Sequence, residues 1–300
     1  MSNSKWTSNN IPDQSGRIAI ITGANSGIGF EAAKELAAKN AEVILAVRNQ
    51  AKGDAALAQI QTDYPNAKLS VRLLDIANLA SVKMFADQFN RDYKQLDLLI
   101  NNAGIMAPPH SKTVDGFESQ FGTNHLGHFA LTAQLIDLLK KTPKSRIVNV
   151  SSNAHRMGKL NFDDLAWENR RYSPWKAYGD SKVANLYFTY ELSRQIKASG
   201  NTVMVTAAHP GLTTSGLAKG VGVKIFVMLF AQKTPMGALP TLMAATEPTA
   251  KSGEYFGPAG FAGTRGYPDK STPNDLAQDA EIAEQLWRVS EEMTGVSFQI

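Results

Sequence analysis

The sequence predicts an α/β fold built on a single doubly wound parallel sheet with helices on both faces. Short apolar segments rich in β-branched residues recur about every 25–50 residues along the chain. These segments are continuously apolar, as in parallel strands that are buried on both faces. Helical segments separate them, and this alternation indicates repeated βαβ units.

The strands and helices of this sheet follow one another in a regular order. Strands are expected at 17–21, 42–47, 69–73, 96–100, 146–150 and 203–207. Helices are expected between them at 30–39, 51–62, 79–91, 121–140 and 177–198. The helix at 79–91 shows the pattern most clearly, because its apolar residues recur on one face, which would pack on the sheet. These residues are Val82, Phe85, Ala86 and Phe89.

Composition and charge exclude several classes of function. The 300 residues carry 31 basic and 27 acidic side chains, and the net charge of +4 is spread along the chain. It forms no basic stripe for a phosphate backbone, so we expect no nucleic-acid partner. The absence of cysteine excludes disulfides, cysteine-ligated zinc, iron–sulfur clusters and thiol catalysis. The histidines form no metal-binding pattern with carboxylates, so we expect no metal.

The chain is predicted to form one domain at 16–300, preceded by a flexible polar tail at 1–15. The segment 212–235 is expected to cover the active site as a substrate lid. The most apolar stretch, 221–231, contains Lys224 and is shorter than the ~20 residues that a membrane span needs. We therefore expect a cytoplasmic protein without a transmembrane segment. Contact of 221–231 with a membrane surface stays open.

Residues 22–29 (TGANSGIG) form a glycine-rich turn between the first predicted strand and the first helix. Glycine permits a tight turn and lets the backbone approach a pyrophosphate, whose charge the helix N-terminus attracts. The alternative is an ordinary strand–helix turn. The spacing G-x-x-x-G-x-G at this junction favours a dinucleotide site and a Rossmann-type sheet. The residues expected to bind the cofactor here are Gly23, Asn25, Ser26, Gly27, Ile28 and Gly29.

The end of the second predicted strand indicates which dinucleotide binds. An acidic residue there would favour NAD, whereas the 2′-phosphate of NADP needs positive charge. This chain has Arg48 at that point, and the nearest acid, Glu42, lies at the other end of the strand. A guanidinium matches a phosphate in charge and in geometry, so Arg48 predicts NADP(H). Arg48 could instead be a solvated surface residue, and Lys52 could compete for the phosphate.

Tyr178 and Lys182 lie four residues apart near the start of the long helix at 177–198, and so share a helix face. A phenol with a pKa near 10 is a poor acid–base catalyst at neutral pH. A neighbouring ammonium is expected to lower that pKa toward the working range. The pair would then exchange a proton with a carbonyl or an alcohol. Taken alone, the spacing is also typical of a surface pair.

Several motifs in one order resemble the short-chain dehydrogenase/reductase family over residues 17 to about 215. The motifs are TGANSGIG (22–29), NNAG (101–104), Asn124 within FGTNHLGHF, SS (151–152) after RIVNV, YGDSK (178–182) and HPG (209–211). The neighbourhoods RIVNVSSNAH, FDDL (162–165) and AYGDSKVANLYFTYEL (177–192) resemble the family's retinol-dehydrogenase-like branch.

The resemblance implies a catalytic set of Asn124, Ser152, Tyr178 and Lys182. In the family the serine hydrogen-bonds the substrate carbonyl, and Ser151 is the alternative to Ser152 here. The asparagine holds a water that passes protons toward the lysine. Lys182 would also bind the nicotinamide ribose, and Tyr178 is expected among the cofactor contacts too. Substrate contacts are expected from Ser152 and Tyr178. By its position three residues past Ser152, His155 is a further candidate for the substrate pocket, and a packing or surface role is the alternative.

The resemblance also assigns the remaining cofactor contacts. Residues after the third and fourth strands would lie beside the adenosine half, and those after the sixth strand beside the nicotinamide. These residues are Asp75, Ile76, Asn102, Ala103, Gly104, Pro210, Gly211 and Thr213. Trp167 and Trp175, in the insertion 153–177, either wall the substrate pocket or anchor the insertion.

Together these features predict an NADP(H)-dependent oxidoreductase. It would transfer a hydride between nicotinamide and a lipophilic carbonyl or alcohol, such as a retinal-like compound or another aldehyde or ketone. One alternative is a non-catalytic NADPH-binding sensor or scaffold. Another is protochlorophyllide reduction, which in this branch relies on a cysteine that the chain lacks. The family forms dimers and tetramers through long helices, here 121–140 and 177–198, so a homodimer or homotetramer is a further expectation.

Overall fold

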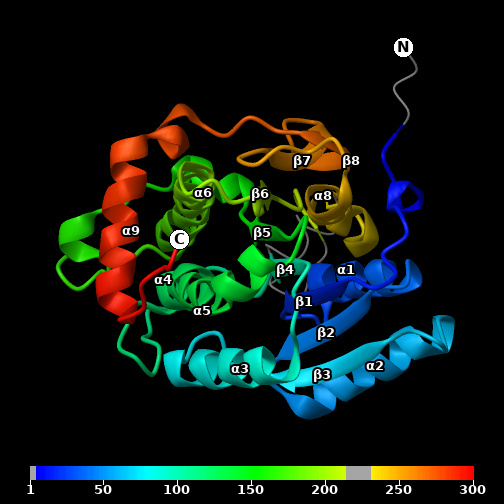
Figure 1. Ribbon diagram of the computed structural model, residues 1–300. Helices are drawn as coiled ribbons and strands as arrows, with labels where there is room; N and C mark the ends of the chain where they lie inside the picture. The colour runs from blue at the N-terminus through cyan, green and yellow to red at the C-terminus, as the bar shows by residue number, and fades with distance from the viewer. Residues whose placement is uncertain (1–4, 214–230) are drawn as a thin grey trace.

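The computed structural model describes residues 5–213 and 231–300 and contains one eight-stranded sheet of order β3-β2-β1-β4-β5-β6-β7-β8 (Figure 1). Neighbouring strands run parallel except for the last pair, β7 and β8. The strands are β1 (Ile18–Thr22), β2 (Glu42–Val47), β3 (Leu69–Leu73), β4 (Leu98–Asn101), β5 (Arg146–Val150), β6 (Met204–Ala208), β7 (Tyr255–Gly260) and β8 (Arg265–Lys270). This confirms the predicted doubly wound α/β fold.

Strand β1 is the third strand of the sheet, where it pairs with β2 on one side and β4 on the other. The order of the strands reverses at this point. Open α/β sheets bind their ligands in the crevice beyond the carboxyl ends of the strands at such a switch. The topology therefore places a binding crevice beside the turn that follows β1.

Helices cover both faces of the sheet (Figure 1). One face carries α1 (Gly27–Ala38), α2 (Gln50–Asp63) and α8 (Thr234–Thr246). The other carries α3 (Leu79–Asp92), α4 (Ser119–Phe121), α5 (Gly127–Lys141), α6 (Pro174–Ala198) and α9 (Ala280–Thr294). Short 3-10 turns lie at Ser8–Asn10, Asn153–Met157, Phe162–Asp164 and Asp275–Gln278.

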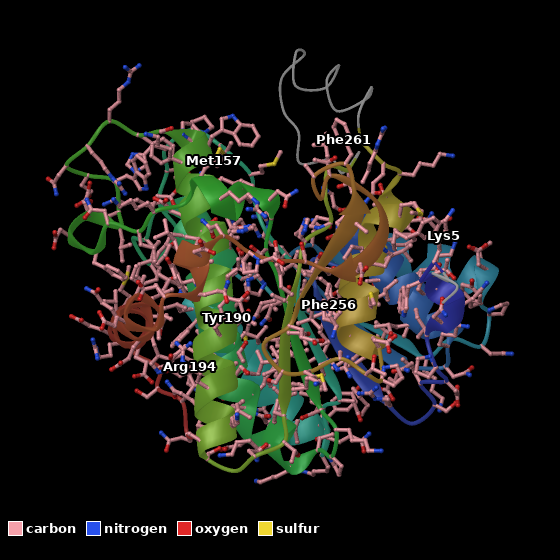
Figure 2. The ribbon with its side chains drawn as sticks, turned by 90° about the horizontal axis from the view of Figure 1, so that it is seen from above. Lys5, Met157, Tyr190, Arg194, Phe256 and Phe261 are labelled. Carbon is pink, nitrogen blue, oxygen red and sulfur yellow. The ribbon has the colours of Figure 1, made fainter. Side chains whose placement is uncertain are left out.

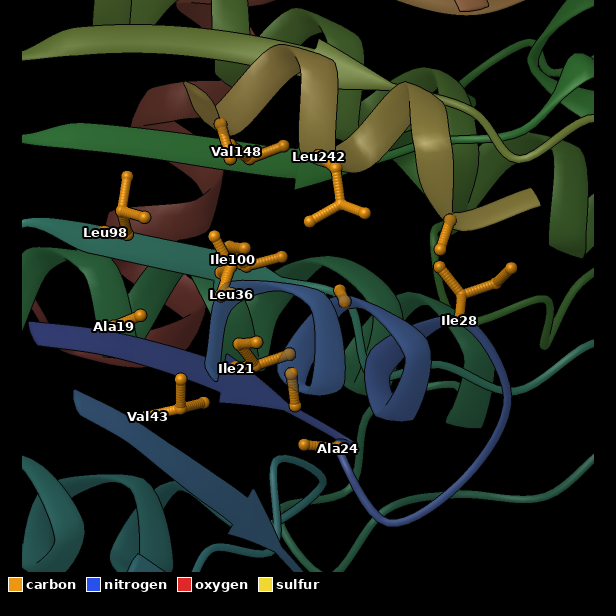
Figure 3. Packing of buried hydrophobic residues seen from close by; sticks show 14 of the residues in the cluster. Ala19, Ile21, Ala24, Ile28, Leu36, Val43, Leu98, Ile100, Val148 and Leu242 are labelled. Atoms are coloured by element: carbon orange, nitrogen blue, oxygen red, sulfur yellow. The ribbon is translucent and has the colours of Figure 1, made fainter. Parts of the chain in front are cut away.

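The apolar strand segments meet the helices in a closely packed core. On the α1 side, Leu36 of α1 and Leu242 of α8 pack against Ile21, Ile100 and Val148 of the sheet (Figure 3). Each of these five side chains has no measurable solvent exposure. Both faces of the sheet are thus buried, as the continuous apolar runs predict.

The predicted helix at 121–140 has an irregular start. It consists of α4, a π-helical turn (Gly122–Leu126) and α5, and the turn contains Asn124. A π-helical turn inserts an extra residue into a helix and is frequent at functional sites. The helix predicted at 177–198 begins earlier, at Pro174, because proline fits the first turn of a helix, where no N–H is needed.

The last third of the chain contains β7, β8, α8 and α9, which the sequence pattern does not predict. The strands read YFGPAG and RGYPDK, and glycine and proline are depleted in strands. Proline is tolerated in β8 because β8 is an edge strand. Helix α8 contains Pro240 in its interior, which weakens its helical pattern.

Helix α9 and the C-terminal tail cover the two long helices α5 and α6. The rings of Trp287 in α9 and Phe298 in the tail contact each other at a tilt of 42°, with centres 4.4 Å apart. Both contact Phe129 of α5, at 5.2 and 5.0 Å, and both contact Phe188 of α6, each at 6.0 Å. The faces of α5 and α6 that carry these phenylalanines are therefore buried by the chain's own C-terminus.

Over residues 5–213 and 231–300, no helix is both long and apolar enough to cross a membrane. Most of the predicted lid at 212–235, and all of the apolar stretch 221–231 except its last residue, lie outside the described residues.

Candidate active site

The predicted site residues gather at the carboxyl edge of the sheet. The glycine turn follows β1, Asn102 follows β4, Ser152 follows β5 and Pro210 follows β6. These four strands are neighbours in the parallel part of the sheet, so their carboxyl ends meet on one side. The N-terminal end of α6, which carries Tyr178, lies at the same edge because the helix runs antiparallel to the strands (Figure 2).

The glycine turn has the backbone that a dinucleotide site requires. Gly23 and Gly27 have positive φ angles of 69° and 59°, a conformation that favours glycine. A Cβ at Gly29 would lie 2.5 Å from Asn102 Nδ2 and 2.7 Å from the carbonyl oxygen of Gly23, so no side chain fits there. Helix α1 begins at Gly27 and has no acidic residue in its first turn. Its N-terminal N–H groups therefore fit a bound pyrophosphate.

Within this turn the remaining predicted residues differ in exposure. Ile28 is buried at 8% exposure, Asn25 is half-buried and Ser26 is exposed. Ser26 occupies the N-cap position of α1, but its side chain makes no capping hydrogen bond. The Ser26 hydroxyl therefore does not cap α1.

Thr22 joins the glycine turn to the loop after β4. Its hydroxyl oxygen accepts hydrogen bonds from the backbone N–H of Asn102 at 2.9 Å and of Ala103 at 2.8 Å. The side-chain amide of Asn102 donates to the carbonyl oxygen of Thr22 at 2.8 Å. These bonds fix the predicted adenosine loop, 102–104, against the end of β1.

The end of β2 exposes Arg48 beside the N-terminus of α2. The first turn of α2 has no acidic residue, and the side chain of Asn49 caps it by accepting from the N–H of Lys52 at 3.0 Å. Glu42, at the far end of β2, accepts a hydrogen bond from Tyr93 at 2.7 Å. The carboxyl end of β2 thus presents positive charge toward the crevice side of the sheet.

The chain after β3 lies close to α5. The N–H of Asp75 donates to the hydroxyl of Ser81 at 2.9 Å, and its carboxylate accepts from the N–H of Ala77 at 3.1 Å. Ile76 is buried, and a Cβ at Gly127 would lie only 2.0 Å from the Ile76 carbonyl oxygen. Because Gly127 has no side chain, the segment 75–76, which is predicted to lie beside the adenosine half of the cofactor, packs directly on α5.

Lys182 is a buried lysine placed beneath Tyr178. It is 4% exposed, donates a hydrogen bond to the carbonyl oxygen of Val150 at 3.1 Å, and lies 5.7 Å from the centre of the Tyr178 ring. Burial lowers the pKa of the Lys182 ammonium to about 8. A lysine with this pKa changes charge close to neutral pH, which is a property of functional lysines.

The phenol of Tyr178 differs from the expectation in one respect. We expected the ammonium of Lys182 to lower its pKa. Burial instead raises the pKa of Tyr178, and the contribution that lowers it comes from a hydrogen bond with Ser152. The desolvation of the nearly buried ring outweighs this bond, so the phenol keeps its proton at neutral pH.

The two serines after β5 have separate partners. The Ser151 hydroxyl is 1% exposed and donates to the carbonyl oxygen of Lys182 at 2.7 Å, within the packing between β5 and α6. The Ser152 hydroxyl is half-buried, accepts from the N–H of Ala154 at 3.2 Å and is near enough to Tyr178 to lower the pKa of its phenol. Of the two, Ser152 is therefore the one that shares the open side of the site with Tyr178.

Asn124 has its whole side chain engaged in hydrogen bonds. Its oxygen accepts from the N–H of Ile105 at 2.9 Å, and its amide donates to the Ile105 carbonyl at 3.0 Å and to the Ser181 hydroxyl at 2.9 Å. A Cβ at Gly104 would lie 2.9 Å from the Asn124 oxygen and 3.5 Å from the nitrogen of Lys182. Asn124 and Lys182 therefore border the same glycine.

His155 is buried between two backbone segments. It is fully buried, its Nδ1 lies 2.7 Å from the carbonyl oxygen of Ser152, and its Nε2 accepts from the N–H of Asn274 at 3.3 Å. Both ring nitrogens thus contact backbone groups. The geometry is that of a residue that holds the Ser152 segment against the chain before α9.

The two tryptophans of the insertion have different surroundings. Trp167 is 6% exposed, and the guanidinium of Arg170 lies 3.6 Å from its ring centre, so it anchors the insertion. Trp175 is 45% exposed and lies edge-on to Tyr178 with ring centres 6.2 Å apart. Trp175 is therefore the tryptophan that borders the site.

The chain after β6 is fixed by residues that the sequence pattern did not single out. Gln232 donates to the carbonyl oxygen of Pro210 at 3.0 Å and accepts from the N–H of Gly266 at 3.0 Å. Gly211 has a positive φ of 67°, and the N–H of Leu212 donates to the Thr264 carbonyl at 2.7 Å. No sequence signal pointed to Gln232, because it links Pro210 to Gly266, which belongs to an unpredicted hairpin.

Thr213 lies near the start of α1. A Cβ at Gly237 of α8 would be 2.1 Å from the methyl group of Thr213 and 2.9 Å from Ile28. The residue predicted to contact the nicotinamide amide and a residue of the glycine turn therefore pack against the same point of α8. In the described ranges, no group of three histidine, aspartate or glutamate side chains is arranged to hold a metal ion.

Comparisons with known proteins agree with this geometry. Residues 17–224 match the model of the short chain dehydrogenase family. The chain is 40% identical to mouse retinol dehydrogenase 12 over 291 residues, which covers 95% of this chain and 88% of that protein. It is 41% identical to human retinol dehydrogenase 13 over 293 residues, with coverages of 94% and 85%.

Solved structures show the same fold. The crystal structure of an uncharacterized protein from Mycobacterium paratuberculosis is 42% identical, with a TM-score of 0.84 and coverages of 99% of this chain and 100% of that one. Salutaridine reductase from Papaver somniferum shares the fold at 24% identity, with a TM-score of 0.64 and coverages of 80% and 99%. The chain therefore belongs to the short-chain dehydrogenase/reductase family, in its retinol-dehydrogenase-like branch, and is an oxidoreductase of alcohols or carbonyls with a fold that binds a nicotinamide cofactor.

Proposed function

We propose that this protein is an NADP(H)-dependent oxidoreductase for a lipophilic carbonyl or alcohol, with Tyr178 as its general acid and base. The observation that carries this proposal is the buried Lys182 nitrogen 5.7 Å from the centre of the Tyr178 ring, with the Ser152 hydroxyl near the phenol. The contact lies at the carboxyl edge of the sheet, beside the glycine turn. It pairs a proton donor with a second hydroxyl that can bind the same oxygen.

The residues around the glycine turn fit a dinucleotide. The pyrophosphate would bind at the N-terminus of α1, over Gly23 and Gly29, where a side chain would clash. The adenosine half would lie along Asp75, Ile76 and the loop 102–104, and the nicotinamide half beside Pro210 and Thr213. When bound, the nicotinamide supplies or takes up the hydride.

Arg48 supports NADP(H) over NAD(H). It is exposed at the end of β2, and the neighbouring first turn of α2 carries no acidic side chain. A ribose 2′-phosphate there would meet a guanidinium without a competing carboxylate from that turn. Lys52 lies on the same exposed turn and is a second candidate for this phosphate.

The protein's own groups account for the proton transfer. Because burial raises the pKa of Tyr178, the phenol is protonated at neutral pH and can donate to a carbonyl oxygen as it becomes an alkoxide. The Ser152 hydroxyl donates a hydrogen bond to the same oxygen. The ammonium of Lys182, whose pKa is about 8, lies 5.7 Å from the centre of the Tyr178 ring and stabilises the phenolate that remains after the proton is donated. This protonation state favours carbonyl reduction near neutral pH.

A lipophilic substrate is supported by apolar side chains at the same edge. Met157 is 54% exposed, Trp175 45% and Phe261 71%, and they come from three different segments of the chain. Figure 2 shows Met157 and Phe261 at the same end of the molecule. The hairpin tip with Phe261 is joined to the Ser152 segment, because Asn153 donates to the carbonyl of Gly263 at 2.8 Å. Retinol, which names the relatives, is a lipophilic alcohol.

A panel of aldehydes and ketones of increasing chain length tests the proposal, with oxidation of NADPH or NADH followed by absorbance. We expect turnover that is faster with NADPH and with the longer substrates. Binding of NADPH without turnover of any member of the panel would contradict the proposal and favour a non-catalytic sensor.

A further inference from the structure

His128 of α5 is a buried histidine that joins two separate parts of the site. Its exposure is 2%. Its Nε2 lies 2.9 Å from the hydroxyl oxygen of Thr22, and its Nδ1 lies 3.1 Å from the backbone carbonyl oxygen of Asn124. No step of the proposed reaction involves this side chain. Thr22 ends β1, whereas Asn124 lies in the π-helical turn before α5.

The hydrogen bonds around Thr22 determine where its hydroxyl proton lies. A hydroxyl has two acceptor lone pairs and one hydrogen. The N–H groups of Asn102 and Ala103 occupy the lone pairs, at 2.9 and 2.8 Å. The hydrogen must then be donated to the Ile100 carbonyl at 3.4 Å or to Nε2 of His128 at 2.9 Å. The shorter contact with His128 is the stronger hydrogen bond.

This assignment fixes the tautomer of His128. Since Nε2 accepts from Thr22, the ring hydrogen resides on Nδ1 and is donated to the Asn124 carbonyl. Burial lowers the pKa of His128 to about 4, so the ring is neutral and carries only one such hydrogen. The hydrogen bonds therefore run in one direction, from the loop 102–103 through Thr22 and His128 to Asn124.

The two ends of this chain of hydrogen bonds meet neighbouring parts of one loop, 102–103 from Thr22 and 104–105 from Asn124. The loop 102–103 lies on the cofactor side. At the other end, the Asn124 side chain and the nitrogen of Lys182 border the α-carbon of Gly104. A displacement of the π-helical turn would change what surrounds Lys182. A displacement of the end of β1 would change the cofactor loop.

We propose that His128 is a positioning residue that orients the backbone carbonyl of Asn124 and couples it to the cofactor loop through Thr22. It touches neither substrate nor cofactor, and it acts through the two residues that it joins. This proposal rests on the function proposed above, since it assigns His128 a part in the same site. The tautomer that it requires, however, is a property of the protein alone.

The first test is therefore independent of catalysis. The ring nitrogens of His128 are observed by NMR in protein labelled with 15N-histidine, and the signals are assigned by their loss in His128→Asn. We expect a neutral ring with hydrogen on Nδ1 at pH 7. Thr22→Val, which removes the hydroxyl, should shift the Nε2 signal. A ring with hydrogen on Nε2, or a charged ring, would overturn the proposal even in an inactive protein.

The second test uses kcat, KM and thermal stability together. We expect His128→Phe to lower kcat about tenfold while the substrate KM changes little. His128→Asn retains an amide donor near the Nδ1 position and should recover most of this loss. Adding Thr22→Val to His128→Phe should lower kcat less than the product of the two single effects. The proposal would be overturned if the two effects on kcat multiply in the double variant, or if His128→Asn recovers none of the loss of kcat.

His125 provides a matched control on the same helical segment. It is 1% exposed, but its Nε2 contacts the hydroxyl of Ser290 in α9 at 2.8 Å rather than a site residue. His125→Phe should lower the melting temperature and leave kcat unchanged. If His125→Phe and His128→Phe lower kcat equally, the effect of His128 is general packing and the proposal fails.

Discussion

The nitrogen of Lys182 lies 5.7 Å from the centre of the Tyr178 ring and donates a hydrogen bond of 3.1 Å to the carbonyl oxygen of Val150. No carboxylate contributes to the pKa of this lysine, which burial alone lowers to about 8. The protein thus holds an amine in a buried position where its charged form is disfavoured. Such a cost is common at functional sites.

Replacing Lys182 should therefore increase stability. The pKa in the folded protein, about 8, is below the ordinary value of 10.5, which corresponds to ~3 kcal/mol of destabilisation at neutral pH. Between these two pH values the unfolded chain binds more protons, so the stability of the wild type rises with pH through this range. Lys182→Met should be the more stable protein at pH 7, and this difference should shrink by about 2–3 kcal/mol at pH 10.

Denaturant unfolding at both pH values measures this effect. Lys176→Met, on the same helix at an exposed position, is the control and should show no such dependence on pH. If the free energies of unfolding of Lys182→Met and wild type differ by the same amount at pH 7 and pH 10, burial of the Lys182 ammonium does not destabilise the folded protein.

The two serines after β5 should affect different properties. Ser152→Ala removes a hydrogen bond to the developing alkoxide and should lower kcat about a hundredfold to a thousandfold, with little change in stability. Ser151→Ala removes a buried bond to the Lys182 carbonyl and should cost ~1 kcal/mol of stability while kcat stays within a few-fold. Steady-state kinetics and thermal unfolding of the two variants check this pair. A larger loss of kcat in Ser151→Ala would reverse the assignment.

Arg48 should discriminate between the two nicotinamide cofactors. Arg48→Leu removes a charged hydrogen-bond donor from the end of β2 and should raise the KM for NADPH about tenfold to a hundredfold, with a small effect on NADH. Lys52→Leu is the matched comparison, and a larger effect there would make Lys52 the phosphate partner. An equal rise of both KM values in Arg48→Leu would reject a role with the 2′-phosphate.

Phe261 should contribute to the preference for long substrates. It lies at the tip of the β7–β8 hairpin, where Phe261, Ala262 and Gly263 all have positive φ angles of 43°, 53° and 73°. Such backbone is costly for non-glycine residues and is often found at functional sites. Phe261→Ala should lower kcat/KM about tenfold for a long-chain aldehyde and leave a short one unchanged.

Exposed apolar residues elsewhere test whether this effect is specific. Val114 is 77% exposed on the loop before α4, so Val114→Ala is the control and should leave the preference for chain length unchanged. A Phe261→Ala variant that loses activity equally on short and long aldehydes would show that Phe261 supports the fold of the site rather than the substrate.

The sequence predicts the parts of the fold that depend on local pattern. The parallel strands from β1 to β6 and the glycine turn are recognisable because continuous apolar runs and glycine spacing follow directly from buried strands and from positive φ angles. The hairpin of β7 and β8 is not predictable in this way, since both strands contain glycine and proline, and the edge position that tolerates proline in β8 is defined only by the assembled sheet.

The same distinction between local pattern and assembled packing applies to the site residues. Tyr178 and Lys182 are recognisable from their i, i+4 spacing, whereas the direction of the pKa change at Tyr178 depends on burial by distant segments. The separate partners of Ser151 and Ser152 depend on how β5 meets α6. His128 is visible in the sequence only as a histidine on a helix, and its link to Thr22 spans 106 residues of chain.

The most direct measurement is the comparison of Tyr178→Phe with wild type on the best aldehyde of the panel. The account predicts that NADPH binds to both proteins with similar affinity, because the other residues proposed to bind the dinucleotide are unchanged. Turnover should fall by a factor of at least ~10²–10⁴ in Tyr178→Phe, since the proton donor is lost. A Tyr178→Phe enzyme with wild-type turnover would contradict the proposed role of this residue.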